Sequence, residues 1–294
     1  MQVVVFSKVL KEKDLPCFQL LFDALHQEGI QAYVYRPLFH QLKDKVDFRR
    51  DVGIFEGYID FCLKKFDAVI TLGGDGTILS AITHIRDAAV PVMGINLGRL
   101  GFLAGIEKKR IGEAVAQLQR GRYWLDERVL LYLESNLPLF GNTRFALNDC
   151  TLLKRDTSSM ITIHAYVNGA YLNSYWADGL IIATPTGSTG YSLSCGGPIV
   201  FPRSGNFVIT PVAPHNLNVR PVVISDDSVI SFELEGRTEN FLCTLDSRFE
   251  SITTEHQLAL RKNDFSIRLI QLQDISFMET LRNKLSWGVD ARNY

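Results

Sequence analysis

Short runs of β-branched residues alternate with helical patterns over the first hundred residues, and this alternation restricts the fold more than any other feature of the sequence. A helical pattern of apolar residues begins at Leu15 and ends at Gly29, where a glycine stops it. The strand patterns cover residues 3–6, 31–35, 66–72 and 90–95, and a second helical pattern covers 77–86. Strands separated by helices predict a parallel sheet with right-handed crossovers.

The pattern changes after Gly121, where a further helix ends. Asn168-Gly169 lies between two alternating runs and predicts a two-residue hairpin turn, because both turn positions favour positive φ. The expected strands lie at residues 129–133, 161–167, 180–184, 208–210, 229–234, 241–245 and 265–270. The sequence therefore predicts an α/β domain over residues 1–122 and a β-rich domain over 123–276. A helical segment over 277–294 is expected to return to the first domain.

Charge and cysteine content narrow the class of protein. The 31 Lys and Arg balance 32 Asp and Glu, so the net charge is -1 and there is no overall field to hold nucleic acid or an anionic membrane surface. The apolar stretches are far shorter than the roughly 20 residues that span a bilayer. Five scattered cysteines without a CxxC pair argue against a disulfide framework and favour a reducing cytoplasm.

A glycine-rich turn from strand to helix carries the first chemical signal, Gly73-Gly74-Asp75-Gly76-Thr77. Glycines let backbone amides approach a phosphate, and the following helix N-terminus favours an anion. Asp75 would repel that phosphate unless a metal ion or a hydroxyl awaiting deprotonation lies between them, which is typical of phosphoryl transfer. Alternatively, Asp75 only caps the helix and the glycines only form a tight turn. GGDG alone leaves both interpretations open.

A second stretch, residues 178–198, reads DGLIIATPTGSTGYSLSCGGP. A strand ends there in a dense run of hydroxyls and glycines around Tyr191. Short donors and acceptors beside an aromatic ring suit a nucleoside, and a simple turn would not need so many polar groups.

These two stretches together resemble the NAD kinase family, which makes NADP from NAD and ATP. The resemblance extends to residues 94–103 (GINLGRLGFL), Asn148-Asp149 and residues 214–221 (PHNLNVRP). Gly190 and Cys195 stand where the family usually has alanine. Residues 246–248 (DSR) stand where many members have Gly-Gln, which leaves the role of Asp246, Ser247 and Arg248 open.

The resemblance implies roles for particular residues. Asp75 would be the general base that takes the proton from the 2′-hydroxyl of the adenosine ribose of NAD, with Gly76 beside the substrate. Gly73, Gly74, Thr77 and Arg99 would bind phosphate. Phe102 would face the adenine side, Asn148 and Asp149 would hold ribose hydroxyls or adenine, and Asp178 would lie at the nicotinamide end. Thr189, Gly190, Tyr191 and Ser194 would bind the nucleoside. Apart from the resemblance, Phe102 reads as core, and Asn148-Asp149 and Asp178-Gly179 read as turns.

The expected protein is thus a two-domain cytoplasmic NAD kinase that uses NAD, ATP and a divalent metal, with magnesium the expected ion. No dedicated metal cage is predicted, and His84, His164 and His215 lack metal-ligand spacing. The family implies a homo-oligomer, either a dimer or a tetramer. Two alternatives are a lipid kinase that shares GGDG and an inactive NADP sensor. The hydroxyl-rich loop argues against the first, and retention of Asp75 argues against the second.

Overall fold

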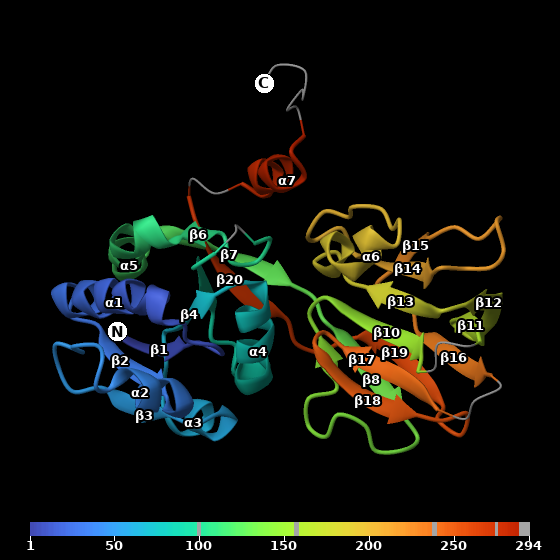
Figure 1. Cartoon of the computed structure of the whole chain (residues 1–294), viewed down its shortest axis with the longest axis horizontal. Helices are drawn as coiled ribbons and strands as arrows, with labels where there is room; N and C mark the ends of the chain where they lie inside the picture. The colour runs from blue at the N-terminus through green and yellow to red at the C-terminus, as the bar shows by residue number, and fades with distance from the viewer. Residues whose placement is uncertain (99–100, 156–158, 237–239, 274–275, 288–294) are drawn as a thin grey trace. The chain divides into compact units, whose positions relative to one another are not determined.

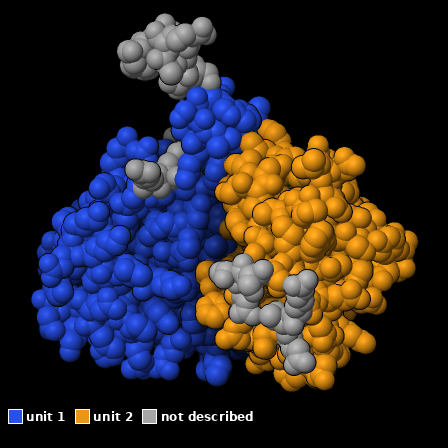
Figure 2. Space-filling view, turned by 45° about the vertical axis from the view of Figure 1, so that its right-hand side comes forward, with its two compact units in different colours: residues 1–127, 267–294 blue, residues 128–266 orange. Residues whose placement is uncertain are grey.

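The computed structural model describes residues 1–98, 101–155, 159–236, 240–273 and 276–287 (Figure 1). These residues divide into two compact units, which Figure 2 colours separately. One unit contains residues 1–127 and the segment that begins at Ile267, and the other contains residues 128–266.

The first unit is built on an eight-stranded sheet in the order β3-β2-β1-β4-β5-β20-β7, with β6 beside β5. Its strands are β1 (Gln2–Phe6), β2 (Gln31–Tyr35), β3 (Gly53–Phe55), β4 (Ala68–Gly73), β5 (Val92–Asn96), β6 (Ile106–Glu107), β7 (Tyr123–Arg128) and β20 (Ile267–Leu272). The pairings of β1 with β2 and β4, of β2 with β3, and of β5 with β4, β6 and β20 are parallel. The parallel sheet predicted from the alternating pattern is confirmed.

The described part of this unit contains six helices, of which the first, second and fifth share a core with the sheet. The six are α1 (Leu15–Gln27), α2 (Arg36–Leu42), α3 (Tyr58–Leu63), α4 (Asp75–Ile85), α5 (Ile111–Gln119) and α7 (Phe277–Leu285), with short 3-10 turns at Glu12–Asp14, Arg86–Ala88 and Lys108–Arg110. α1 and α5 lie side by side (Figure 1) and share one core with Val3 and Val5 of β1. α1 ends where predicted, because Gly29 takes a φ of +70° that most residues avoid.

The second unit contains two six-stranded antiparallel sheets, in the orders β15-β14-β13-β10-β17-β18 and β12-β11-β16-β19-β8-β9. The strands of the first are β10 (Asp149–Lys154), β13 (Gly179–Ala183), β14 (Asn206–Val212), β15 (Val222–Ser225), β17 (Phe241–Leu245) and β18 (Arg248–Ile252). Those of the second are β8 (Leu131–Ser135), β9 (Phe145–Ala146), β11 (Ile161–Val167), β12 (Ala170–Ala177), β16 (Ile230–Glu235) and β19 (Leu258–Lys262). Side chains from both sheets form one core, so the unit is a β-sandwich.

Burial alternates along β11, where Ile161, Ile163 and Ala165 point inward, so one face of its sheet packs against this core. Asn168 and Gly169 both have positive φ and connect β11 to β12, so the predicted hairpin is confirmed. Only two short helical segments interrupt the described strands, a 3-10 turn at Gly187–Thr189 and α6 (Tyr191–Ser194).

The last strand differs from the expectation. The pattern at residues 265–270 was expected to belong to the β-rich half, but β20 joins the sheet of the first unit, where Leu269 pairs with Val92. Periodicity identifies a strand and not its partner, so the sequence could not assign the sheet. The chain therefore returns to the first unit at Ile267. Among the described residues, no helix is long and apolar enough to cross a membrane.

Candidate active site

The glycine-rich turn lies where β4 ends and α4 begins. Gly74 and Gly76 are exposed, and a Cβ built at either position would meet nothing within 4 Å. The first turn of a helix carries backbone N–H groups without intrahelical partners, so this open backbone can receive an anion. Gly73 has a packing role instead, because a Cβ there would lie 2.0 Å from the Thr77 hydroxyl oxygen.

Asp75, the first residue of α4, is fixed by three backbone amides. Its Oδ2 accepts the Phe102 N–H at 2.8 Å, and its Oδ1 accepts the N–H groups of Leu103 at 3.1 Å and Ala104 at 2.9 Å. A Cβ at Gly101 would lie 1.9 Å from Oδ1, so only glycine allows this approach. A carboxylate offers about four lone-pair sites. Three amides occupy three of them, and one on Oδ2 remains for a substrate hydroxyl.

Phe102 connects this loop to the C-terminal helix. Its ring centroid is 6.3 Å from that of Phe277, and the Lys284 ammonium is 5.5 Å from the same ring. Both partners belong to α7, which is held by the buried Leu281. The ring that sequence analysis assigned to the adenine side thus packs beside α7, and its backbone N–H binds Asp75.

In the second unit, Asp149 begins β10 directly after Asn148, and both residues are held against the hydroxyl-rich loop. The Thr184 hydroxyl donates to the Leu147 carbonyl at 2.5 Å, and the Thr184 N–H donates to the Asn148 carbonyl at 2.9 Å. A Cβ at Gly187 would lie 2.0 Å from the Asn148 carbonyl oxygen. The two motifs, separate in sequence, therefore form one structural group.

The Asp149 carboxyl has an unusual environment for an acid. It is only 7% exposed, and within the described ranges no hydrogen bond reaches its oxygens. Burial, and then the charge of Asp246, raises the pKa of Asp149 to about 7. A buried acid that lacks a donor and titrates near neutrality is a typical feature of a functional site.

Two further predicted residues, Gly190 and Tyr191, lie close to Asp149, whereas Asp178 is paired with Lys154 at the far end of β10. A Cβ at Gly190 would be 3.9 Å from both the Asn148 side-chain nitrogen and Asp149 Oδ2, so the backbone of Gly190 borders the pair. Tyr191 is 42% exposed, and burial, the Cys195 thiol and the charges of Asp178 and Asp149 raise the pKa of its phenol. Asp178 forms an ion pair of 2.6 Å with Lys154.

Most hydroxyls of the long motif are used inside the protein. Ser188 Oγ donates to the Pro185 carbonyl at 2.7 Å, Thr189 Oγ1 donates to the Thr186 carbonyl at 3.1 Å, and Ser192 Oγ lies 2.8 Å from Thr210 Oγ1. These hydroxyls therefore hold the loop itself, and the assignment of Thr189 to the nucleoside stays a prediction. Ser194 remains exposed.

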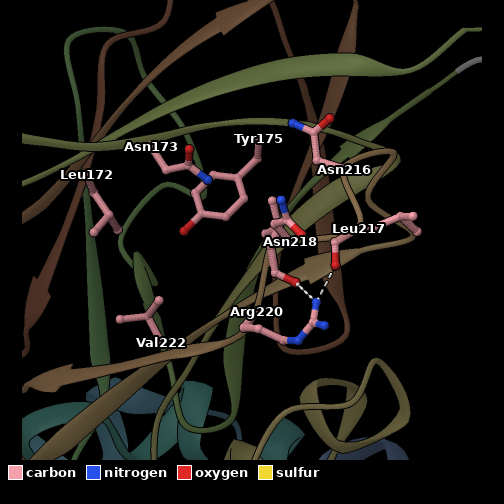
Figure 3. Close-up of a pocket in the computed structure, with 9 residues that line it drawn as sticks. Leu172, Asn173, Tyr175, Asn216, Leu217, Asn218, Arg220 and Val222 are labelled. Carbon is pink, nitrogen blue, oxygen red and sulfur yellow. Dashed lines mark hydrogen bonds between the residues drawn. The ribbon is translucent and has the colours of Figure 1, made fainter.

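The segment at residues 214–221 borders a separate pocket of about 590 Å³ against β12 (Figure 3). Arg220 donates to the carbonyls of Leu217 and Val219, at 2.6 and 2.8 Å, so much of its hydrogen bonding stabilises its own loop. The centroid of the His215 ring lies 4.2 Å from that of the tilted Trp176 ring, and the backbone N–H of His215 donates to the Trp176 carbonyl at 2.9 Å. His215 is accordingly a packing residue in this structure.

The sequence matches the ATP-NAD kinase N-terminal domain over residues 8–123 and the ATP-NAD kinase C-terminal domain over residues 147–272. It is 54% identical to an NAD kinase of Cytophaga hutchinsonii over 98% of both chains, and 44% identical to one of Flavobacterium psychrophilum over the whole of both. The chain belongs to the NAD kinase family.

Solved structures of the same fold include yeast NADH kinase complexed with NADH, with a TM-score of 0.86 and 21% identity, covering 100% of this chain and 89% of that one. An NAD kinase from Archaeoglobus fulgidus in complex with ATP gives a TM-score of 0.74 and 23% identity, covering 97% of this chain and 98% of that one. The two-domain NAD kinase fold expected from the motifs is confirmed.

The sequence left the roles of Asp246 and Arg248 in this NAD kinase fold open and gave no sign of a role for Arg128. Asp246 and Arg248 contact the backbone that leads to Asn148, and the nearly buried Arg128 donates to the Thr186 hydroxyl at 3.1 Å. The only signal in the sequence was the departure at residues 246–248. Arg99, assigned to phosphate from the sequence, lies outside the described residues.

Proposed function

We propose that this chain transfers the terminal phosphoryl group of ATP to the 2′-hydroxyl of the adenosine ribose of NAD, with Asp75 as the general base. The observation that carries the proposal is the Asp75 carboxylate at the N-terminus of α4. Three amides orient it, and one lone-pair site stays open beside an exposed glycine backbone. That site accepts the hydroxyl proton. The amides of the turn from Gly73 to Thr77 receive the phosphates together with Arg99, which the family resemblance assigns to phosphate.

The dinucleotide is held by Asn148, Asp149, Asp178 and the loop that carries Thr189, Gly190, Tyr191 and Ser194. Phe102 is assigned to the adenine side, as the family resemblance implies. The grouping of Asn148, Asp149 and Gly190 in the second unit supports this assignment. Replacing Asn148 by alanine leaves a ligand group unmatched, so the KM for NAD should rise far more than the KM for ATP.

Magnesium is the proposed metal, and the donor set fits an ion that arrives on the phosphates. Within the described ranges no three His, Cys, Asp or Glu side chains converge on one point, which suits magnesium better than a caged zinc or iron. Bound with ATP, the ion supplies neutralisation of phosphate charge.

The alternatives considered from the sequence receive no support. The relatives that match over their whole length are NAD kinases, and not lipid kinases or sensors. We also propose a cytoplasmic location, which five free thiols support. A homo-oligomer is proposed as well, supported by β12 at the end of its sheet with Tyr171 and Trp176 exposed.

The test of the function is an assay of the purified chain with NAD, ATP and magnesium, in which an NADP-specific dehydrogenase detects the product. We expect NADP to form and to disappear when a chelator removes the divalent ion. Full activity in chelator, or stoichiometric zinc or iron in the purified protein, would contradict the metal assignment. The absence of NADP under all conditions would contradict the function.

A further inference from the structure

The turn between β17 and β18 has an unusual backbone. Asp246, its first residue, has a φ of +54°, a region that glycine adopts freely and other residues adopt at a cost. A non-glycine residue persists in this conformation when surrounding contacts fix it. The contacts of the Asp246 side chain must therefore account for the positive φ at this position.

The Asp246 carboxylate binds the backbone that carries the dinucleotide residues. Its Oδ2 accepts the Leu147 N–H at 3.0 Å, and its Oδ1 accepts the N–H groups of Asn148 at 2.7 Å and Asp149 at 3.4 Å. The Asp246 N–H in turn donates to the Asp149 carbonyl at 3.0 Å. Residues 147–149 thus have Asp246 as a partner for three amides and one carbonyl.

Arg248, at the other end of the same turn, holds the preceding residues. Its guanidinium donates to the carbonyls of Thr143 and Phe145 and lies 5.7 Å from the Phe145 ring centroid. An acid therefore binds the amides and a base binds the carbonyls of one continuous segment. Asp246 and Arg248 are about a hundred residues away in sequence, and they fix the segment from a single turn.

We propose that Asp246 is a positioning residue of the dinucleotide site, which holds the backbone of residues 147–149 and thereby orients the side chains of Asn148 and Asp149 toward the ligand. Arg248 supports it by fixing the approach to that segment. The proposal rests on the proposed role of Asn148 and Asp149 in binding NAD.

Asp246 also provides a charge beside Asp149, and this gives the proposal a distinctive signature. Asp246 from the turn is the charged group that acts on Asp149, and the Asp149 charge in turn raises the pKa of Tyr191 in α6 and of Cys150 in its own strand. Burial and the charge of Asp246 raise the pKa of Asp149 to about 7. Ionised Asp149 accepts hydrogen bonds from ribose or amino groups, so the KM for NAD should fall as the pH rises through about 7.

The experiment compares Asp246→Asn with wild type. Asparagine keeps the shape but loses the charge, and its NH2 group cannot accept an amide. The KM for NAD should rise roughly 5- to 20-fold while the KM for ATP stays within about twofold. The pH at which the KM for NAD falls should also move below the wild-type value, because the neighbouring negative charge is gone.

Two further variants separate positioning from folding. Asp246→Gly suits the left-handed backbone, so the turn should form, yet it lacks every side-chain acceptor and should raise the KM for NAD like asparagine. Glu250→Gln is the matched control, since it makes the same chemical change on β18, where Glu250 binds the Phe140 N–H at 2.8 Å. Its KM values and pH profile should equal those of wild type.

Equal increases in both KM values for Asp246→Asn and Asp246→Gly, or a wild-type pH profile in Asp246→Asn, would overturn the proposal. A wild-type enzyme that forms no NADP would instead overturn the proposed function.

Discussion

The Asp75 side chain has two roles, and a substitution should change one of them and keep the shape needed for the other. Its carboxylate is the proposed base, and it also fixes the amides of residues 102–104. We expect Asp75→Asn to lower kcat by about a hundredfold to ten-thousandfold, because an amide cannot accept the hydroxyl proton. Steady-state kinetics, with thermal unfolding as the check on folding, measure this. A rate within a few-fold of wild type would remove Asp75 from the role of base.

Asp149 should make stability depend on pH. Its pKa is about 7 in the folded chain against 3.8 as the ordinary value, so the folded state keeps its proton longer than the unfolded state. The protonated Asp149 carboxyl therefore stabilises the fold at low pH, and this contribution to the free energy of unfolding is lost as the pH rises from about 4 to 7. Asparagine does not titrate, so Asp149→Asn does not lose this stability. The difference in free energy of unfolding between Asp149→Asn and wild type should therefore shift in favour of the variant by up to about 2 to 3 kcal/mol between pH 5 and pH 8.

Urea unfolding of both proteins at the two pH values measures the difference. An advantage of equal size at pH 5 and pH 8 would show that the Asp149 carboxyl does not titrate in this range.

At the scale of elements, the loop from Gly101 to Ala104 and the first turn of α4 act together. A Cβ at Gly101 would lie 1.9 Å from Asp75 Oδ1, so Gly101→Ala must displace the carboxylate without removing it. A shift of about 1 Å can cost about a hundredfold in rate, and we expect a loss of this size in kcat. Gly112→Ala in α5 is the matched control, because nothing lies within 4 Å of its Cβ. If both variants keep wild-type kcat, the position of Asp75 is not critical.

Elements with strong periodicity were predictable, and those defined by their partners were not. The apolar face of α1 and the inward alternation of β11 were visible in the sequence. β18 was missed because its exposed and half-buried residues give little apolar signal before Ile252. The start of β10 at Asp149 read as a turn, because a polar residue that is buried by tertiary contacts looks like a surface residue in sequence.

In the molecule as a whole, the candidate active site also depends on tertiary contacts that the sequence does not reveal. Motif residues that the family resemblance identified, such as Asp75, Asn148 and Gly190, could be named from the sequence. The residues that hold these motif residues in place could not be named from the sequence. Asp246, for example, lies 98 residues from Asn148 and binds its backbone N–H. The amides that hold Asp75 belong to residues 27 to 29 positions further along the chain. A backbone contact leaves no mark in the sequence of the residue that donates it.

The chain path through the two units predicts which fragments fold. Residues 128–266 are continuous and contain their own sandwich core, so this fragment should fold alone. The first unit is discontinuous, because β20 lies between β5 and β7 in its sheet. A chain that ends at Ser266 lacks this strand, whose Ile267, Leu269 and Leu272 are at most 2% exposed. Its first unit should therefore lose cooperative unfolding, as followed by circular dichroism in urea.

A chain that ends at Gln273 is the control, because it retains β20 and lacks only the segment with α7. We expect it to keep the cooperative transition of the first unit and to lose activity, since Phe102 loses its contacts with Phe277 and Lys284. The two truncated chains differ only in residues 267–273, so a difference between their unfolding curves belongs to β20. Identical curves for both, or a fragment 128–266 without a cooperative transition, would show that stability is not divided along the boundary between the units.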